Sequence, residues 1–384
     1  MRRYSIAAFL LTTSLLVGCA GTPTSQIGPP PGQNNPAPAA RTVTPVSTAI
    51  PLRGVSIETL RAQSAAGTTL PIYTGSIKSP LDGKTYSYSI VGSDPTKSNT
   101  TTTISYVPIE LVVTFPDGTV LDPRQPGCDD TVSVSDRLYK GPNFVKTPLT
   151  SNGVNLGKAQ VNDAFQRAEF WTILKGHKYH TELKATGSPI VVNYKPVNGT
   201  TNPGPKCTQV NHRIGKIPFT DFDVVARNLA IRYAKPNQAA LILTYNIYLS
   251  SSTFTYAGYH GSFPVSGGTQ VYAVMTYSDP FTLEPGIEDI SIPTHEIGEL
   301  LNDPFVTNAT PAWGHIGQVS GCQSNLEVGD PLTSHDFTLN YNNFTYHPQE
   351  LVFFSWYYRT PSTGTGGKYS FEGSFTKTQA LCTS

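Results

Sequence analysis

The sequence carries almost no net charge and few charged side chains. Its 384 residues include 27 Lys and Arg against 26 Asp and Glu, which gives a formal charge of +1, and charged residues make up only 14% of the chain. A protein that binds nucleic acid usually has a strongly basic surface. Because the chain contains no long run of Lys or Arg, we exclude nucleic acid as a partner.

Long apolar segments are scarce as well. The stretch from Ile6 to Val17 is too short to cross a bilayer comfortably, and it follows the positively charged Arg2 and Arg3. A short apolar run after a positive start is typical of a secretory signal. We therefore expect an exported protein in which residues 1–18 are a signal peptide.

The end of this signal has a second pattern. The run Leu16-Val17-Gly18-Cys19 resembles the bacterial lipobox. The resemblance implies acylation of Cys19 and a lipid-anchored protein of the cell envelope, and Ala20 implies the outer membrane if the organism has one. Acyl chains anchor a protein without a transmembrane helix. An ordinary signal peptide that happens to contain a Cys is the alternative.

The segment after Cys19 lacks the pattern of a folded domain. From Ala20 to Ile50 it contains seven Pro, one charge at Arg41 and no apolar periodicity. Such a composition is typical of a disordered, partly extended linker. We expect residues 19–50 to tether the folded part to the membrane.

Cysteine is rare, and the chain has no CxxC pair, so a Cys-based zinc site is a weak alternative. Four Cys remain besides Cys19, an even number in an exported protein, which favours two disulfides. Four Cys allow three pairings. Pairing of nearest neighbours would join Cys128 to Cys207 and Cys322 to Cys382.

The rest of the composition favours strands and turns. There are 20 Tyr and 17 Phe among 33 Gly and 32 Pro. Periodicity and turn residues predict a hairpin over 109–121, helices over 161–171 and 222–233, the second capped by Asp221, and strands over 240–249 and 269–277. We therefore predict an α+β fold, with a β-rich lobe over 51–155 and an α+β domain over 156–384.

One predicted helix carries chemistry. It runs from Ser291, the expected cap, through Pro293 in its first turn to a stop at Pro304. The apolar residues Ile297, Leu300 and Leu301 lie at helical spacing and should face the core. His295 and Glu299 lie four residues apart, so they stack one turn apart on another face.

This arrangement is similar to the zincin motif H-E-x-x-H, in which residues i and i+4 bind zinc and the intervening Glu is the general base. Here Glu299 replaces the second His, and Glu296 stands in the position of the base. The motif predicts a Zn²⁺ site, or a site for another divalent cation. The alternative is a surface His–Glu pair, with Glu296 in solvent.

A third ligand would favour the metal site. The acidic turn that contains Glu327 and Asp330 can return a carboxylate to the helix, and His315 and His335 are rivals. Glu327 suits the layout of gluzincin-type peptidases, so we predict His295, Glu299 and Glu327 as ligands, with His260, His315 and Asp330 as possible supporting residues.

Several motifs together resemble the plant phosphate-induced, EXORDIUM-like family and bacterial secreted proteins with an H-E-[LI]-[AG]-E signature. They are Gly258-Tyr259-His260-Gly261, Val271-Tyr272-Ala273-Val274, the His295-Glu296-Ile297-Gly298-Glu299 helix, Trp313 and Glu327-Val328-Gly329-Asp330. The resemblance covers roughly residues 240 to 335. It implies a zincin-like fold in which two strands precede the motif helix, with a metal site and Glu296 as base.

Two functions are compatible with these patterns. The first is a membrane-anchored metal-dependent peptidase in which Tyr259, His260 or His315 assists the oxyanion and an open strand edge at 271–277 binds an extended peptide or protein substrate. The second is a non-catalytic envelope lipoprotein whose metal site is structural or vestigial and which binds glycan or protein.

Overall fold

The computed structural model describes residues 25–26, 69–174, 176–206, 211–252, 254–282 and 286–383. Strands make up 41% and helices 19% of the structure, which confirms the α+β class. The predicted signal peptide, Cys19 and all of the predicted tether except Ser25–Gln26 lie outside the described residues. Those two residues form strand β1, parallel to β14 (Thr255–Tyr256). Among the described residues, no helix has both the length and the apolar composition needed to cross a membrane.

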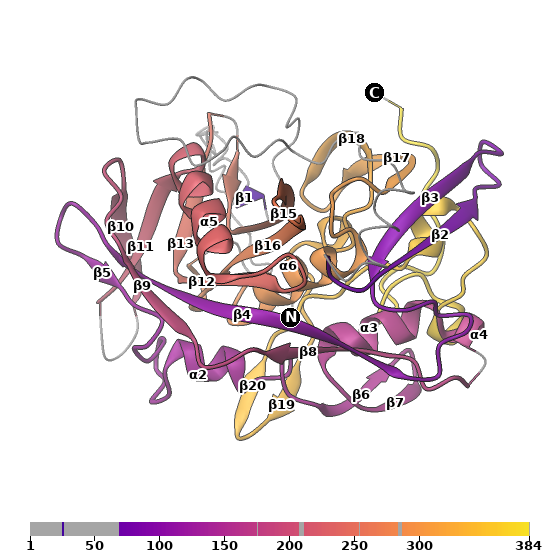
Figure 1. The fold of residues 1–384 in the computed structure, drawn as a ribbon, viewed down its shortest axis with the longest axis horizontal. Coiled ribbons are helices and arrows are strands. Elements are labelled where there is room, and N and C mark those ends of the chain that lie inside the picture. Colours follow the sequence, from indigo (N-terminus) through magenta and orange to yellow (C-terminus); the bar gives the residue numbers. More distant parts are fainter. Residues whose placement is uncertain are drawn as a thin grey trace, which may run out of the picture.

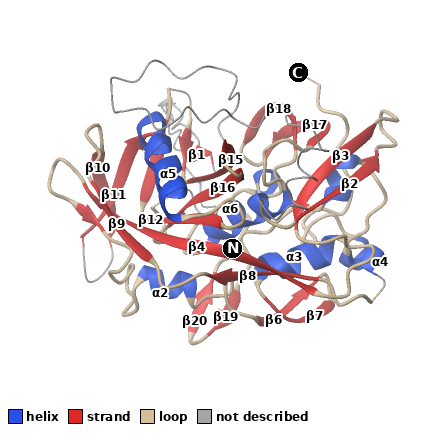
Figure 2. Cartoon of the chain, in the orientation of Figure 1, coloured by secondary structure: helices blue, strands red, loops and turns tan. Residues whose placement is uncertain are grey.

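Figures 1 and 2 show the order of the elements along the chain. The remaining strands are β2 (Ile72–Lys78), β3 (Thr85–Val91), β4 (Thr101–Thr114), β5 (Val120–Leu121), β6 (Thr147–Ser151), β7 (Val154–Ala159), β8 (His180–Ala185), β9 (Ile190–Tyr194), β10 (Thr200–Lys206), β11 (Asn211–Pro218), β12 (Ala239–Tyr245), β13 (Ile247–Ser250), β15 (Gly258–Val265), β16 (Gly268–Tyr277), β17 (Ala309–Ile316), β18 (Val319–Asn325), β19 (Leu339–Tyr341) and β20 (Phe344–Tyr346). The α-helices are α2 (Val134–Tyr139), α3 (Val161–Glu169), α4 (Trp171–Leu174), α5 (Phe219–Tyr233), α6 (Ser291–Asn302) and α7 (Phe354–Tyr358).

A seven-stranded sheet forms the centre of the fold. Its main path runs β15-β16-β12-β4-β5, and β8 and β9 also pair with β4. The long strand β4, purple in Figure 1, pairs in parallel with β12, β8 and β9. Strands from both sides of the predicted boundary at residue 155 therefore share this sheet. At its other end, β15 is an antiparallel edge strand beside β16.

Two helices cover opposite faces of this sheet. Leu241 and Leu243 of β12 lie in one hydrophobic cluster with Ile297 of α6. Ala240 and Ile242, which alternate with them, lie in another cluster with residues of α5. Parallel strands that are covered on both faces read as continuous apolar runs. This explains why every residue of β12 is buried.

The sequence predicts one continuous strand over 240–249, but the structure has two strands there, β12 and β13. The predicted strand divides at Asn246, whose backbone has a φ of 50°. Asn adopts this left-handed conformation more readily than most residues. The Asn246 amide donates a hydrogen bond to Asp279 Oδ2 at 2.7 Å and accepts one from the Asp279 N–H at 2.8 Å. The chain therefore leaves β12 and continues as β13 in a second sheet.

The predicted helix caps are also wrong, although the helices exist. Helix α5 begins at Phe219, so Asp221 lies inside its first turn and accepts a hydrogen bond from Asn198. Helix α6 begins at Ser291, whose hydroxyl donates to Asp336 at 2.8 Å and does not cap the helix. The predicted helix over 161–171 is broken, because α3 ends at Glu169. Asp221 and Ser291 thus make tertiary hydrogen bonds instead of capping their helices, and the chain bends after Glu169.

The hairpin predicted around Pro116-Asp117-Gly118 is confirmed. Strands β4 and β5 pair antiparallel, with Val113 opposite Leu121. Gly118 has a φ of 84°, which suits glycine better than any other residue.

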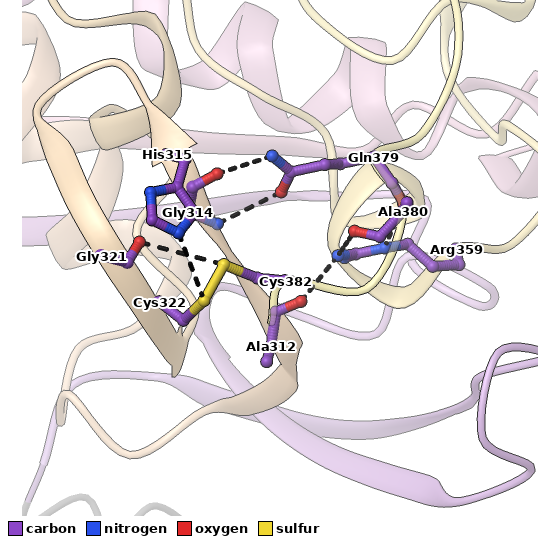
Figure 3. Close-up of a disulfide and its surroundings, with 9 residues drawn as sticks. All are labelled: Ala312, Gly314, His315, Gly321, Cys322, Arg359, Gln379, Ala380 and Cys382. Carbon is purple, nitrogen blue, oxygen red and sulfur yellow. Dashed lines mark hydrogen bonds between the residues drawn. A yellow bond between two sulfur atoms is a disulfide. The ribbon is translucent and has the colours of Figure 1, made fainter. Parts of the chain in front are cut away.

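Cys322 of β18 and Cys382 near the C-terminus form a disulfide with a Cα–Cα distance of 5.8 Å, as the nearest-neighbour pairing predicts. Figure 3 shows Gln379 beside it, bonded through its side chain to both backbone polar groups of Gly314. The chain end is thus attached to the β17–β18 hairpin. Cys128 is disulfide-bonded, and its predicted partner Cys207 lies outside the described residues.

The double substitution Cys322→Ser with Cys382→Ser should lower the free energy of unfolding by about 4 kcal/mol, because the bond closes a loop with a sequence separation of 60 residues. Urea denaturation measured on the variant and on wild type would show the difference. An unchanged unfolding midpoint would contradict the prediction.

Candidate metal centre

Helix α6 is buried around its whole circumference. Ile297, Leu300 and Leu301 face the core as predicted, but His295 and Glu299 are also buried, each with 0% exposure. The interpretation as a surface His–Glu pair is therefore wrong. Glu296 is buried as well, and both of its carboxylate oxygens lack a hydrogen-bond partner. Burial of an unpaired carboxylate is costly, so this helix face needs a compensating charge.

The ring of His295 is oriented by Gln349. The Gln349 amide nitrogen donates to the Gly329 carbonyl at 2.7 Å, so its oxygen faces His295 Nδ1 at 3.1 Å and accepts the Nδ1 proton. Burial opposes the charged ring, but Glu299 and Asp330 raise the pKa of His295 well above its usual value, so a proton or a cation is favoured at Nε2. When the ring is neutral, it presents the lone pair of Nε2. That atom has no hydrogen-bond partner. Metal-binding histidines are held in this way, with one nitrogen donating to a fixed acceptor and the other free to bind.

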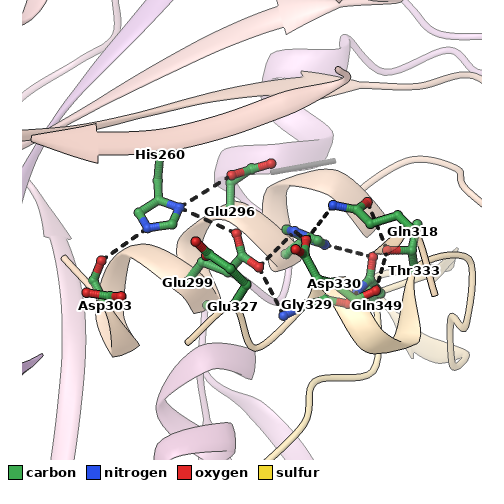
Figure 4. A network of polar contacts seen from close by, with 12 residues as sticks. His260, Glu296, Glu299, Asp303, Gln318, Glu327, Gly329, Asp330, Thr333 and Gln349 are labelled. Atoms are coloured by element: carbon green, nitrogen blue, oxygen red, sulfur yellow. Dashed lines mark hydrogen bonds and ion pairs between the residues drawn. The ribbon is translucent and has the colours of Figure 1, made fainter. Parts of the chain in front are cut away.

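His260 on β15 is held in the same manner. Its Nε2–H donates to the backbone carbonyl of Asp303 at 3.1 Å, as Figure 4 shows. Its Nδ1 faces α6 and has no hydrogen-bond partner. The Asp303 carboxylate in turn accepts backbone N–H groups from Thr307 and Asn308, which fixes the end of α6. A second imidazole is thereby aimed at Glu299.

Glu299 lies between the two imidazoles. Its Oε1 is 3.1 Å from His295 Nε2, and its Oε2 is 3.4 Å from His260 Nδ1. The Gly329 N–H also donates to Oε1 at 3.1 Å. A lone pair on each ring nitrogen would face a carboxylate oxygen, so a proton or a cation has to lie between them.

Two more carboxylates complete the cluster. His295, Glu299 and Asp330 present ligand atoms that lie within 4.8 Å of one another, and so do His260, Glu299 and Glu327. Asp330 Oδ1 is 3.5 Å from His295 Nε2. Glu327 accepts a hydrogen bond from Asn325 at 2.6 Å through one oxygen, and its other oxygen is unpaired. The predicted set of His295, Glu299 and Glu327 therefore combines members of two groups.

The cluster has more buried carboxyl groups than cationic partners. Burial, followed by the charge of Glu299, raises the pKa of Glu327 well above its usual range and that of Asp330 to about 6. Burial also raises the pKa of Glu296. Burial opposes the charged form of Glu299 too, but His295 and His260 lower its pKa to about 2. A divalent cation would supply the missing positive charge, so the donor set fits a metal.

The other predicted site residues lie elsewhere. His315 is exposed on β17 beside Cys322, whose sulfur is in the disulfide. His335 is exposed. Tyr259 points to the opposite side of β15 from His260 and donates to Asp223 of α5 at 3.0 Å. Trp313 is buried and donates to the Asn325 carbonyl. None of these four side chains contributes to the α6 cluster.

Sequence patterns missed the residues that orient the cluster. Gln349 lies 54 positions after His295, and no spacing rule connects them. Gly329 and Gly258 provide space, because a Cβ at Gly329 would lie within 2.5 Å of the His295 ring and one at Gly258 would meet the Glu296 carboxylate. Both glycines belong to motifs that carry the resemblance, but nothing in the sequence connected either of them with the side chain it makes room for.

Comparisons with models of protein families, with curated proteins and with solved structures gave no match to this chain. The resemblance to the EXORDIUM-like family therefore stays a prediction, and function has to be inferred from the geometry of the cluster.

The stabilisation of the protein by Zn²⁺ should increase with pH. Between about pH 5.5 and about pH 8, Glu327 and Glu296, whose pKa values burial raises well above the usual range, hold protons in the folded apoprotein that the unfolded chain has already released, so apoprotein stability falls as pH rises. Glu299 does not contribute in this window, because its pKa is about 2. Zn²⁺ displaces these protons and binds more tightly at the higher pH.

Thermal unfolding with Zn²⁺ and with a chelator at both pH values tests this. The predicted result is a larger Zn²⁺-dependent rise in Tm at the higher pH. An equal rise at both values would contradict the proton linkage.

The substitution Gly329→Ala should weaken cation binding by at least about tenfold, because the new methyl group would displace the His295 ring. The backbone of Gly329 has a φ of −88°, so alanine causes no backbone strain there. Gly321→Ala on β18 is the matched control, since a Cβ at that position meets nothing within 4 Å. Isothermal titration with Zn²⁺ measures both, and equal affinities would contradict the prediction.

Proposed function

We propose that the chain is a metal-dependent hydrolase that cleaves peptide bonds, exported and anchored to the cell envelope through Cys19. The observation that carries the proposal is the convergence of unpaired, buried ligand atoms on one turn of α6, with an additional free carboxylate beside them. His260, His295, Glu299, Glu327 and Asp330 are the available ligands.

Glu296 is the reason for proposing catalysis as well as binding. Its carboxylate is 4.0 Å from His260 Nδ1 at the closest, and it makes no hydrogen bond. A purely structural centre would not require this further unpaired carboxylate, which is costly to bury. A free carboxylate beside a cation is suited to accept a proton from the attacking water and pass it to the leaving amine.

The cation, when bound, would supply Lewis-acid polarisation of the substrate carbonyl and lower the pKa of water. The protein residues would do the rest. Gln349 and the Asp303 carbonyl keep the two imidazoles in the required tautomers. Gly258 leaves room for the Glu296 side chain against β15.

The arrangement of elements around α6 supports a zincin-like interpretation. Two strands, β15 and β16, precede the helix and form an antiparallel pair. Both contact α6, and β15 carries His260. This agrees with the order of elements that the sequence motifs imply.

The predicted peptide-binding edge needs correction. Strand β16 pairs with β15 on one side and with β12 on the other, so residues 271–277 have no open edge. A substrate would have to bind elsewhere. Of the proposed ligands, Asp330 is the most accessible, with 7% of its side chain exposed against 0% for the two histidines.

The second candidate is a non-catalytic lipoprotein in which the cation stabilises the fold. The burial of the ligand groups favours it, because a substrate has to reach the reacting atoms. The two candidates share the cation and differ in the role of Glu296.

The substitution Glu296→Gln should keep the bound Zn²⁺ and reduce cleavage of casein or of a peptide library by at least about a hundredfold. Glu372→Gln, at an exposed position, is the control and should leave cleavage unchanged. Zinc content and cleavage are measured on the same preparations. A loaded wild-type protein that cleaves no peptide would support the second candidate, and full activity in Glu296→Gln would exclude Glu296 as the base.

A further inference from the structure

We propose that the α6 centre holds two divalent cations bridged by Glu299, with His260 and Glu327 on one and His295 and Asp330 on the other. The inference rests on the proposed function in that both require a cation at α6. It adds the number of ions and the assignment of each ligand.

The two oxygens of Glu299 face different imidazoles. Oε1 lies 3.1 Å from His295 Nε2, and Oε2 lies 3.4 Å from His260 Nδ1. A carboxylate that binds one ion through both oxygens would direct them to the same point. Here the oxygens are directed to separate nitrogens, which is the arrangement of a bridging carboxylate.

The two histidines cannot easily share one ion. Ligand atoms lie about 2 Å from a zinc ion, so two ligands of one ion are separated by at most roughly 4 Å. His260 and His295 fall in different groups of mutually close ligand atoms, and Glu299 is the member common to both. Each group supplies one imidazole and one further carboxylate.

Each group contains ligand atoms without a partner, whereas both oxygens of Asp330 accept hydrogen bonds from the side chains of Gln318 and Gln323. His260 Nδ1, His295 Nε2, Glu299 Oε2 and Glu327 Oε2 are buried without a hydrogen bond. The group with His260 and Glu327 therefore needs a cation as much as the group with His295 and Asp330 does. A single ion at His295, Glu299 and Asp330 would leave His260 and Glu327 unsatisfied.

The balance of charge also favours two ions. Glu296, Glu299, Glu327 and Asp330 would carry four negative charges when ionised, and two divalent cations supply four positive charges. Among the ion pairs of the described residues, those that involve these carboxylates join them to histidines and not to Lys or Arg. With one divalent ion, two of these buried carboxyl groups would have to stay neutral by holding protons.

The cluster of Asp163, His180 and Glu182 provides a contrast, because its polar groups already have partners within the protein. Asp163 and His180 pair at 2.8 Å, and the second Asp163 oxygen accepts the Thr181 N–H at 2.8 Å. Glu182 pairs with Lys146 at 2.7 Å. These groups have protein partners and need no cation, so His180 is a suitable control position.

The stoichiometry of Zn²⁺ tests the inference. The protein is stripped with a chelator, reloaded with Zn²⁺, desalted and analysed for metal and protein content. Two ions per chain are expected. One ion per chain would overturn the inference and leave the proposed function intact, whereas no ion would overturn both.

Variants assign the ligands to each position. His260→Ala and Glu327→Gln should each reduce the content from two ions to one, and the isosteric Glu327→Gln keeps the test valid if His260→Ala does not fold. His180→Ala should retain two ions. Two ions in both site variants would overturn the assignment.

Loading with Mn²⁺ tests the bridge. Two Mn²⁺ ions bridged by one carboxylate should give an exchange-coupled electron paramagnetic resonance spectrum. A spectrum of isolated Mn²⁺ at full occupancy would show that Glu299 does not bridge them and would overturn the inference.

Discussion

The structure around α6 depends on the contact between Glu299 and two imidazoles, each of which has its other ring nitrogen held by a fixed acceptor. Gln349 accepts the proton of His295 Nδ1, and the Asp303 carbonyl accepts the proton of His260 Nε2. When these rings are neutral, the nitrogens that face Glu299 carry lone pairs. Positive charge between these groups, as protons or as metal, is the condition under which this core can be stable.

This constraint explains features of the fold that are otherwise unrelated. Edge strand β15 places the His260 side chain beside Glu299 of α6. The turn from Glu327 to Asp330 lies against α6, with Gly329 close to His295. The chain that follows this turn comes back to the cluster and contributes Gln349, which contacts His295. Three segments far apart in sequence thus meet on one helix face, and the sheet between α5 and α6 provides the rigid support.

Sequence patterns predicted the parts of this arrangement that are local. The spacing of His295, Glu296 and Glu299 placed them on one helix, and apolar periodicity located α5, β12 and β16. Ends and interruptions were less predictable, because a tertiary contact decided them. Asn246 breaks a continuous apolar run through its bonds to Asp279, and Ser291 bonds Asp336 rather than its own helix.

The ligand set could be predicted only in part for the same reason. Glu327 and Asp330 differ by three positions, and the sequence offered no means to decide which imidazole each would approach. His260 stood out as a motif residue, but its pairing with Glu299 depends on the register of β15 against β16. Gln349 carried no signal at all.

The central claim is that cations occupy the space between Glu299 and the two histidines. The most direct measurement is an anomalous difference map at the zinc absorption edge, from crystals of the Zn²⁺-loaded protein. The account predicts density about 2 Å from Glu299 and from His295 or His260. Density only at another cluster, such as Asp163 and His180, or none in fully loaded protein, would contradict it.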